Sequence, residues 1–283
     1  MTLDIEHLRS WIGKTESRTD IISALSVHGL AATLDRDEPE PVAGDAVPPA
    51  GHWLYSLAPF VRQSMLGPDG HPQRGGFLPP VPLPRRMWAG SRIVFHEPLR
   101  VGDPLQRVST VADVSGKEGR TGPLVFVKVR HEVSNGRALA LVEEQDIVYR
   151  DNPQPGEPVP APKAAPGTHD FARTIVPDAP LLFRYSALTH NGHRIHYDQP
   201  YVTQVEGYPG LIVHGPLIAT LLLDLLRRKL PDATVATFAF RAVKPLFDIA
   251  PFEVCGRVDG KTVQLWAKDA DGALAMEATA VLA

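Results

Sequence analysis

The sequence predicts an α+β fold made of two similar halves, each with a long helix packed on a curled antiparallel sheet. Three observations predict it. A proline-rich segment divides the chain, short motifs recur in the same order on either side of it, and apolar runs separated by turn dipeptides close each half. A chain of 283 residues, 43% of them hydrophobic, can bury a core of the required size.

The dividing segment is residues 151–167, DNPQPGEPVPAPKAAPG, which contains six prolines. Proline lacks an amide donor and fixes its own φ, so this composition disfavours both helix and central strand and predicts an extended linker. We therefore expect a first domain over residues 1–150 and a second over residues 168–283.

Two pairs of motifs indicate that the halves are copies of one unit. SALSVHGLAATLD at 23–35 aligns with SALTHNGHRIHYD at 186–198, and PLRVGDP at 98–104 aligns with PLFDIAP at 245–251. Because the order of the motifs is preserved, we interpret the likeness as an old duplication.

The second half has the clearer pattern of elements. A short helical segment is expected near 186–193, and a strongly apolar helix from Pro216 to about Leu230. Antiparallel strands are expected at 233–243, 252–258, 261–268 and 273–282, with hairpin turns at Asp259-Gly260 and Asp271-Gly272.

The first half is less regular. Asn135-Gly136 predicts a hairpin near its end. Residues 67–84, GPDGHPQRGGFLPPVPLP, are too rich in proline and glycine to form a helix or strand. We expect this insertion to be either a packing lid or an element that shapes the substrate pocket.

Composition excludes several classes of protein. The single cysteine, Cys255, excludes an internal disulfide framework and fits a reducing compartment. The first residues show no apolar signal segment, so a cytoplasmic location is expected. The longest apolar stretch, 211–226, is too short and too interrupted to span a bilayer, and a net charge of −3 argues against a nucleic-acid partner.

A family resemblance rests on FRYSALTHNGHRIHYD at 183–198 followed by EGYPGLIVHGPL at 206–217. The pair resembles the signature of MaoC-like, R-specific enoyl-CoA hydratases, whose fold is the hotdog. His196 takes the position of the family's histidine, and Asn191 stands where the family usually has aspartate.

Within that family the chain is most similar to the branch of itaconyl-CoA and mesaconyl-CoA hydratases, as RMWAG at 86–90 also suggests. The resemblance implies a double hotdog with a degenerate first copy and a catalytic second copy. It also implies an acyl-CoA substrate and that a homodimer of such units can form.

The chemistry of hydration supports His196 and Gly215 as catalytic residues. Adding water to an enoyl thioester needs a base for the water, a proton for the α-carbon and a donor to the enolate oxygen. An imidazole can take up and return a proton near neutral pH. The Gly215 amide precedes Pro216 at the start of a helix, where it can donate to an oxyanion.

Asn191 is the departure from the family pattern. An amide can orient water but cannot take its proton, so either His196 works alone or a carboxylate such as Asp198 or Glu206 assists it. In the motif alignment the first copy has His28 and Thr33 at the positions of Asn191 and His196, so we expect that copy to be catalytically silent.

Four further residues are candidates for substrate binding: Arg184, Arg194, Tyr208 and His214. Either arginine could clamp a substrate carboxylate, and surface ion pairs are the alternative for both. The histidines at 190, 193 and 196 do not predict a metal, because their spacing spreads them around a helix and the chain has one cysteine. No metal and no cofactor are expected, and His193 is expected to be structural.

The sequence therefore predicts a hydro-lyase that adds water to, or removes it from, a short branched or dicarboxylic enoyl-CoA such as itaconyl-CoA or mesaconyl-CoA. The alternatives are a 3-hydroxyacyl-thioester dehydratase of fatty-acid or sterol side-chain metabolism, a hotdog thioesterase, and a non-catalytic acyl-CoA-binding protein.

Overall fold

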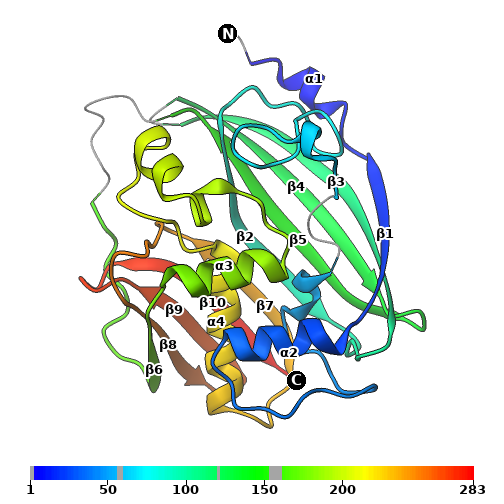
Figure 1. Cartoon of the computed structure of the whole chain (residues 1–283), viewed down its shortest axis with the longest axis vertical. Helices are drawn as coiled ribbons and strands as arrows, with labels where there is room; N and C mark the ends of the chain where they lie inside the picture. The colour runs from blue at the N-terminus through cyan, green and yellow to red at the C-terminus, as the bar shows by residue number, and fades with distance from the viewer. Residues whose placement is uncertain (1–2, 56–59, 120–121, 153–160) are drawn as a thin grey trace.

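The protein is described by a computed structural model that covers residues 3–55, 60–119, 122–152 and 161–283. Its centre is one ten-stranded sheet in the order β1-β3-β4-β5-β2-β7-β10-β9-β8-β6. All neighbouring strands of this sheet are antiparallel. Figure 1 shows the strands of the first half beside those of the second half.

Each half contributes five strands. The first half provides β1 (Thr15–Ile21), β2 (Arg85–Phe95), β3 (Pro104–Gly119), β4 (Gly122–Ser134) and β5 (Leu139–Arg150). The second half provides β6 (Phe171–Ile175), β7 (Val235–Ala242), β8 (Phe252–Asp259), β9 (Thr262–Lys268) and β10 (Leu274–Leu282). The order of strands in one half mirrors the order in the other, about the contact between β2 and β7.

The two halves are joined along β2 and β7, from Gly90 opposite Arg241 to Val94 opposite Thr237. A β-carbon on Gly90 would lie 2.4 Å from the carbonyl oxygen of Phe240. Glycine is therefore needed at the point where the two backbones approach most closely.

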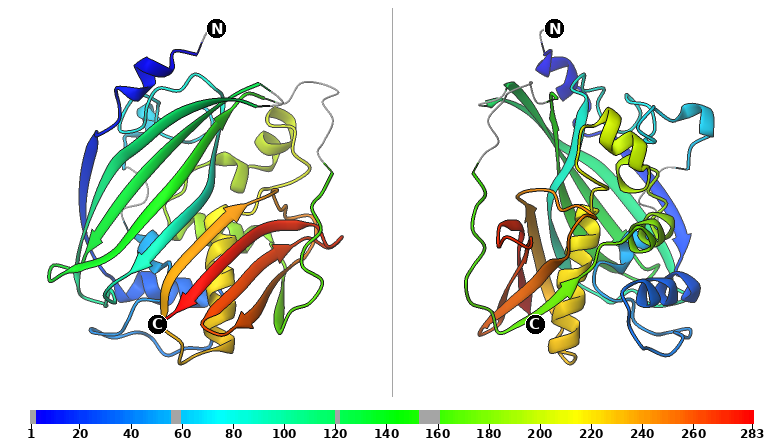
Figure 2. Two further views of the ribbon diagram at one scale, coloured as in Figure 1. Left: turned by 180° about the vertical axis from the view of Figure 1, so that it is seen from behind. Right: turned by 60° about the vertical axis from the view of Figure 1, so that its left-hand side comes forward.

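The helices lie together on one face of the sheet (Figure 2). They are α2 (Ala24–Thr33), α3 (Ala179–Leu188) and α4 (Gly215–Lys229), while the short α1 (Ile5–Arg9) packs near the far end of β3. Short helical turns are η1 (Gly51–Leu54), η2 (Gln63–Met65), η3 (Arg194–His196) and η4 (Tyr201–Val205). Helix α4 packs on β6, β8, β9 and β10 and is buried from Leu217 to Leu226. No helix in the described part of the chain is long and apolar enough to cross a membrane.

The expectation of a long helix in each half is wrong. Between α2 and β2, where the first half would hold its counterpart of α4, the described residues form only the short turns η1 and η2. Four prolines between residues 39 and 49 prevent a continuous helix, and Ala50 has a positive φ of 67°.

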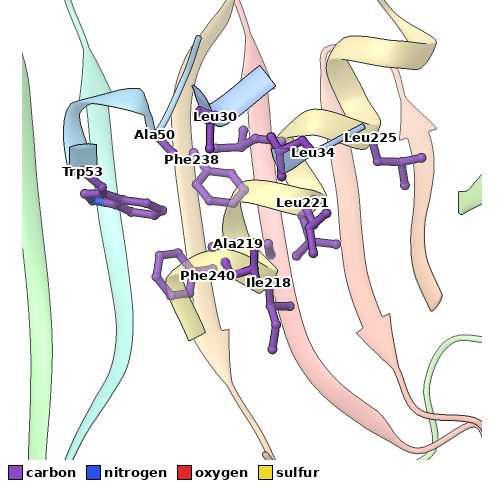
Figure 3. Close-up of a cluster of buried hydrophobic side chains, with 14 of the residues drawn as sticks. Leu30, Leu34, Ala50, Trp53, Ile218, Ala219, Leu221, Leu225, Phe238 and Phe240 are labelled. Atoms are coloured by element: carbon purple, nitrogen blue, oxygen red, sulfur yellow. The ribbon is translucent and has the colours of Figure 1, made fainter. Parts of the chain in front are cut away.

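The main apolar cluster spans both halves. Trp53 of η1 meets Phe240 of β7 edge to face, with ring centroids 6.1 Å apart. Figure 3 shows Trp53 and Phe240 with Leu30 of α2 and Ile218 and Leu221 of α4 in the same cluster. Residues on either side of the β2–β7 contact thus share one apolar interior.

The predicted elements of the second half are confirmed for the long helix and all four strands, to within two residues. The hairpin turns are confirmed too, with positive φ at Gly136, Gly260 and Gly272. Residues 67–84 contain no helix or strand, as expected. The short helix was predicted in the wrong place, near 186–193. In the structure α3 begins after its cap Asp178 and ends at Leu188.

The first motif pair does not mark equivalent places. Ser23 precedes the first residue of α2, whereas Ser186 lies in the last turn of α3. The assignment of His28 and Thr33 as counterparts of Asn191 and His196 is therefore wrong. The second motif pair does correspond, because 98–104 leads from β2 to β3 and 245–251 leads from β7 to β8.

The predicted linker lies partly outside the described residues, at 153–160. Its remainder is tied to the second half, since the Ala165 amide donates to the Gly272 carbonyl and the Leu274 amide donates to the Lys163 carbonyl. The domain boundaries themselves stay a prediction.

Candidate active site

His196 ends the short turn η3, and a single hydrogen bond fixes its orientation. Its Nδ1 lies 2.7 Å from the carbonyl oxygen of Ile212. A carbonyl can only accept, so Nδ1 carries the hydrogen and Nε2 keeps a free lone pair. The Ile212 amide in turn donates to the Ile195 carbonyl at 3.0 Å, which ties the loop of His196 to the entry of α4. His196 is thus held as a proton acceptor.

The ring of His214 supports this arrangement. The two imidazoles of His196 and His214 are stacked, with centroids 3.7 Å apart and planes 19° apart. His214 is fully buried, and its Nε2 lies 2.8 Å from the hydroxyl of Ser186. The structure therefore places His214 beneath His196 as a packing partner, and does not present it to a ligand as the sequence analysis expected.

Burial sets the protonation of this pair. It lowers the pKa of His196 to about 4, although the hydrogen bond to the Ile212 carbonyl acts in the opposite direction. Burial, together with the nearby His196 and His193, also lowers the pKa of His214 well below its ordinary value. At neutral pH His196 is therefore neutral, as a general base must be.

Gly215 is the first residue of α4, whose preceding residue His214 makes no side-chain cap. The first amides of a helix have no partner within the helix and attract negative charge. A β-carbon on Gly215 would lie 4.0 Å from the Trp88 carbonyl, so the space in front of this amide is bounded by β2. The Gly215 amide can serve as an oxyanion donor close to the stacked histidines.

Asn191 has a structural task in the loop between α3 and η3. Its side-chain oxygen accepts a hydrogen bond of 3.0 Å from the His193 amide. This turn follows His190, which adopts a positive φ of 50°. Among the described residues no contact joins Asn191 to His196, so its predicted role in orienting water rests on its place in the loop alone.

Neither arginine that was predicted to clamp a substrate carboxylate is available for this role at the site. Arg184 lies exposed on α3 and makes no ion pair or hydrogen bond with the part of the chain that the structure describes. Arg194 is fully engaged: it pairs with Asp198 at 2.8 Å, donates to the Pro68 carbonyl at 2.8 Å and lies over the ring of Tyr201. Arg194 therefore anchors structure.

Tyr208 and the two candidate carboxylates are likewise engaged elsewhere. The Tyr208 hydroxyl accepts a hydrogen bond of 2.6 Å from Arg85. Glu206 accepts from the Tyr201 hydroxyl at 3.0 Å and lies 3.8 Å from Arg85. Asp198 accepts from the Tyr201 amide at 3.1 Å. These contacts assign Tyr208 and both carboxylates to holding the loop.

The insertion at residues 67–84 brings an acidic side chain to the site that the sequence analysis missed. The Arg194 amide donates to the Asp69 carbonyl at 2.9 Å, and a β-carbon on Gly70 would lie 1.9 Å from the Gly192 carbonyl oxygen. The insertion of the first half is therefore docked on the loop of the second half that carries His196. The available signal was the triplet Asp69-Gly70-His71, which follows Gly67 in the insertion.

Asp69 and His71 form a hydrogen-bonded pair within this insertion. One carboxylate oxygen of Asp69 lies 2.9 Å from Nδ1 of His71, and the other accepts from the His71 amide at 3.0 Å. Burial tends to raise the pKa of Asp69, but the hydrogen bonds from the side chain and the amide of His71 outweigh it and hold that pKa below its ordinary value. The carboxylate is thus ionised.

His193 lies between this pair and His196. Its ring centroid is 4.1 Å from that of His71 and 5.5 Å from that of His196. Side-chain donor atoms of Asp69, His71 and His193 all lie within 4.8 Å of one another, a set that could hold a cation. Burial lowers the pKa of both His71 and His193, and the positive charge of Arg86 acts in the same direction on each. The positive charge of Arg86 disfavours binding of a metal ion by these three residues.

The profile of one protein family, hydroxyacyl-thioester dehydratase type 2, matches residues 50–248. The chain belongs to this family. The match includes the insertion, the loop of His196 and the start of α4. The protein is therefore an enzyme, a hydro-lyase.

Two relatives extend the family match over most of the chain. The chain is 50% identical over 276 residues to mesaconyl-C(4)-CoA hydratase of Chloroflexus aurantiacus, covering 96% of this chain and 97% of that protein. It is 26% identical to the mitochondrial hydroxyacyl-thioester dehydratase type 2 of Schizosaccharomyces pombe, covering 87% of this chain and 90% of that one.

Solved structures show the fold. The MaoC-like dehydratase of Phytophthora capsici superposes with a TM-score of 0.71 at 13% identity, covering 99% of this chain and 98% of that one. HtdX of Mycobacterium tuberculosis superposes with a TM-score of 0.63 at 19% identity, covering 94% of this chain and 99% of that one. The hydratase therefore has the hotdog-type fold of the MaoC-like dehydratases.

Proposed function

We propose that this hydratase adds water to mesaconyl-C4-CoA or a closely related dicarboxylic enoyl-CoA. The observation that carries the reaction type is the neutral His196, whose free Nε2 lies beside the uncapped start of α4. The choice of substrate is supported by the relative that shares half of its residues over nearly the whole chain.

The geometry accounts for each step of hydration. Nε2 of His196 takes a proton from water as the water oxygen bonds to the β-carbon. The π electrons of the double bond move to the thioester oxygen, where the Gly215 amide donates to the developing charge. The α-carbon then takes the proton back from His196, which returns to its neutral form. The reverse sequence removes water from a 3-hydroxyacyl thioester.

Arg86 is our candidate for binding the second carboxylate of such a substrate. It lies on β2 opposite Tyr149 of β5, whose side chain is buried, and is itself half-buried. Within the described residues no carboxylate pairs with it, while its charge acts on His71 and His193. An inward-facing guanidinium without an acidic partner suits a planar carboxylate ligand. It replaces the clamp expected from Arg184 and Arg194.

We interpret the mirrored strand order as a double hotdog, with catalysis confined to the second copy. In this interpretation the first copy has lost its long helix, and it contributes the insertion and β2 to the site of the other copy. Itaconyl-CoA carries a carboxylate of the same kind and remains a second candidate substrate.

A panel of thioesters tests the proposal. Loss of the enoyl-thioester absorbance would be followed with mesaconyl-C4-CoA, itaconyl-CoA, crotonyl-CoA and a long-chain enoyl-CoA. We expect the highest kcat/KM for the first. A marked preference for the long chain would instead assign the enzyme to the 3-hydroxyacyl-thioester dehydratases, as the name of the S. pombe relative suggests. Release of free CoA without hydration would show a thioesterase.

A further inference from the structure

The proposed general base, His196, has no free carboxylate beside it on its own loop. Asn191 replaces the aspartate of the family signature, and its oxygen is used by the His193 amide. Asp198 and Glu206 are bonded to Arg194 and Tyr201. The imidazolium that forms on His196 during turnover is therefore buried without an obvious counter-charge, which is costly.

A carboxylate close to this loop lies on the other half of the chain. Asp69 is ionised and holds Nδ1 of His71 at 2.9 Å. The ring of His71 meets the ring of His193, which meets His196 nearly perpendicularly, at 86°. Three imidazoles and one carboxylate thus form a continuous row from the insertion to the general base.

We propose that Asp69, His71 and His193 together do the work of the family's aspartate. His193 is the catalytic member, which accepts the second O–H of the attacking water and so aims its oxygen at the β-carbon. Asp69 and His71 are positioning residues, which act through His193. No proton has to travel along the row: the proton taken by His196 is the one returned to the α-carbon. This inference deepens the proposed function and rests on it.

The spacing of the donor atoms suits this role. The side-chain atoms of Asp69, His71 and His193 lie within 4.8 Å of one another, a distance at which the charge of a carboxylate acts on a buried imidazole. Neutral histidines can accept from water, and burial keeps His193 neutral. The negative charge of Asp69 acts against this effect of burial and raises the proton affinity of His193.

The insertion is docked on the loop of His196 by contacts that do not involve the Asp69 charge. The insertion is docked by the backbone carbonyls of Pro68 and Asp69, both bonded to Arg194. Asp69→Asn keeps the size of the side chain and an oxygen that can accept from the His71 amide. The variant therefore removes the charge without removing the docking contacts.

The experiment measures Asp69→Asn, His193→Ala and the double variant with crotonyl-CoA and mesaconyl-C4-CoA across pH. We expect kcat to fall about tenfold in Asp69→Asn and about 100-fold in His193→Ala, with little change in KM. The double variant should be no slower than His193→Ala, because Asp69 acts only through His193. Fully additive losses would overturn the inference.

Two further readouts separate this role from a structural one. The pKa values of His71 and His193, followed by NMR titration, should fall in Asp69→Asn and stay unchanged in Asp113→Asn, which removes one carboxylate charge from an exposed position on β3. Unchanged pKa values with unchanged kcat in Asp69→Asn would overturn the inference, while leaving the proposed function intact. Turnover lost on treatment with EDTA and restored by Zn²⁺ would also overturn it, by assigning the three residues to a metal.

A different experiment tests the proposed function. It is contradicted if the wild-type enzyme hydrates none of the thioester panel, whereas the NMR titration of Asp69→Asn needs no substrate. The two failures are thus distinguishable.

Discussion

The ring of His196 lies flat on the ring of His214, with centroids 3.7 Å apart, while its Nδ1 is bonded to the Ile212 carbonyl. One face and one nitrogen of the imidazole are thereby occupied by the protein. Only Nε2 and the other face remain for the substrate. The base is therefore held in place before substrate binds.

Replacing His196 by alanine removes this base. We expect turnover to fall by about 10²–10⁴-fold, the usual contribution of a positioned acid or base. The substitution leaves the stacked partner His214 bonded to Ser186, so circular dichroism should show a folded protein. His28→Ala, on α2, is the control and should keep most of the activity. A His196→Ala enzyme of near wild-type rate would contradict the assignment.

The pH dependence follows from the burial of His196. Its pKa lies at about 4, below the ordinary value near 6.5. A base works only when deprotonated, so kcat/KM should hold its plateau through pH 6.5 and be lost as pH falls towards 4. A pH–rate profile of kcat/KM measures this. An acid limb centred near 6.5 would show that His196 is solvated in the free enzyme.

Gly215→Ala tests the oxyanion position. The added methyl group fits the protein, since the nearest atom is the Trp88 carbonyl oxygen at 4.0 Å, but it occupies the space in front of the helix start. We expect kcat/KM to fall roughly 10- to 100-fold with an unchanged Tm. Gly167→Ala, where no atom lies within 4 Å, is the matched control. Equal activity in both variants would remove Gly215 from the mechanism.

Gly70→Ala tests the docking of the insertion. Gly70 has a φ of 87°, which disfavours other residues, and its β-carbon would meet the Gly192 carbonyl. We expect the insertion to move off the catalytic loop, so that kcat falls at least about tenfold while the sheet stays folded. Gly76→Ala has open space around it and should behave as wild type. Identical kinetics in the two variants would show that docking is unimportant.

Arg86→Gln tests recognition of the substrate carboxylate. A hydrogen bond to a charged group contributes about 1.5–3 kcal/mol, so kcat/KM for mesaconyl-C4-CoA should fall roughly 10- to 100-fold. Crotonyl-CoA has no second carboxylate and should lose little. An equal loss for both substrates would assign Arg86 to the structure or to the thioester, and Arg86→Lys should restore part of the selectivity.

The second half was predictable because its signals are local. Apolar periodicity and turn dipeptides located α4 and β7–β10, and a His-Gly-Pro sequence located the start of α4. The loss of the first long helix was also readable, from the prolines at 39–49. The alignment of residues 23–35 with 186–198 was wrong, because the similar residues begin one helix, α2, and end another, α3.

The Asp69–His71 pair could not be located from the sequence. It lies more than a hundred residues from His193, and the two are brought together by the pairing of β2 with β7 and by the bonds of Arg194 to the insertion. No local pattern encodes such a contact. The arginine clamps failed for a similar reason, since a nearby acidic partner or carbonyl had already engaged Arg194.

The contact between β2 and β7 also limits how this chain can be divided. A fragment beginning at residue 168 would expose β7 as an open sheet edge, which invites aggregation. The same fragment would lack the insertion that docks on the loop of His196. We therefore expect neither half to form the proposed site without the other.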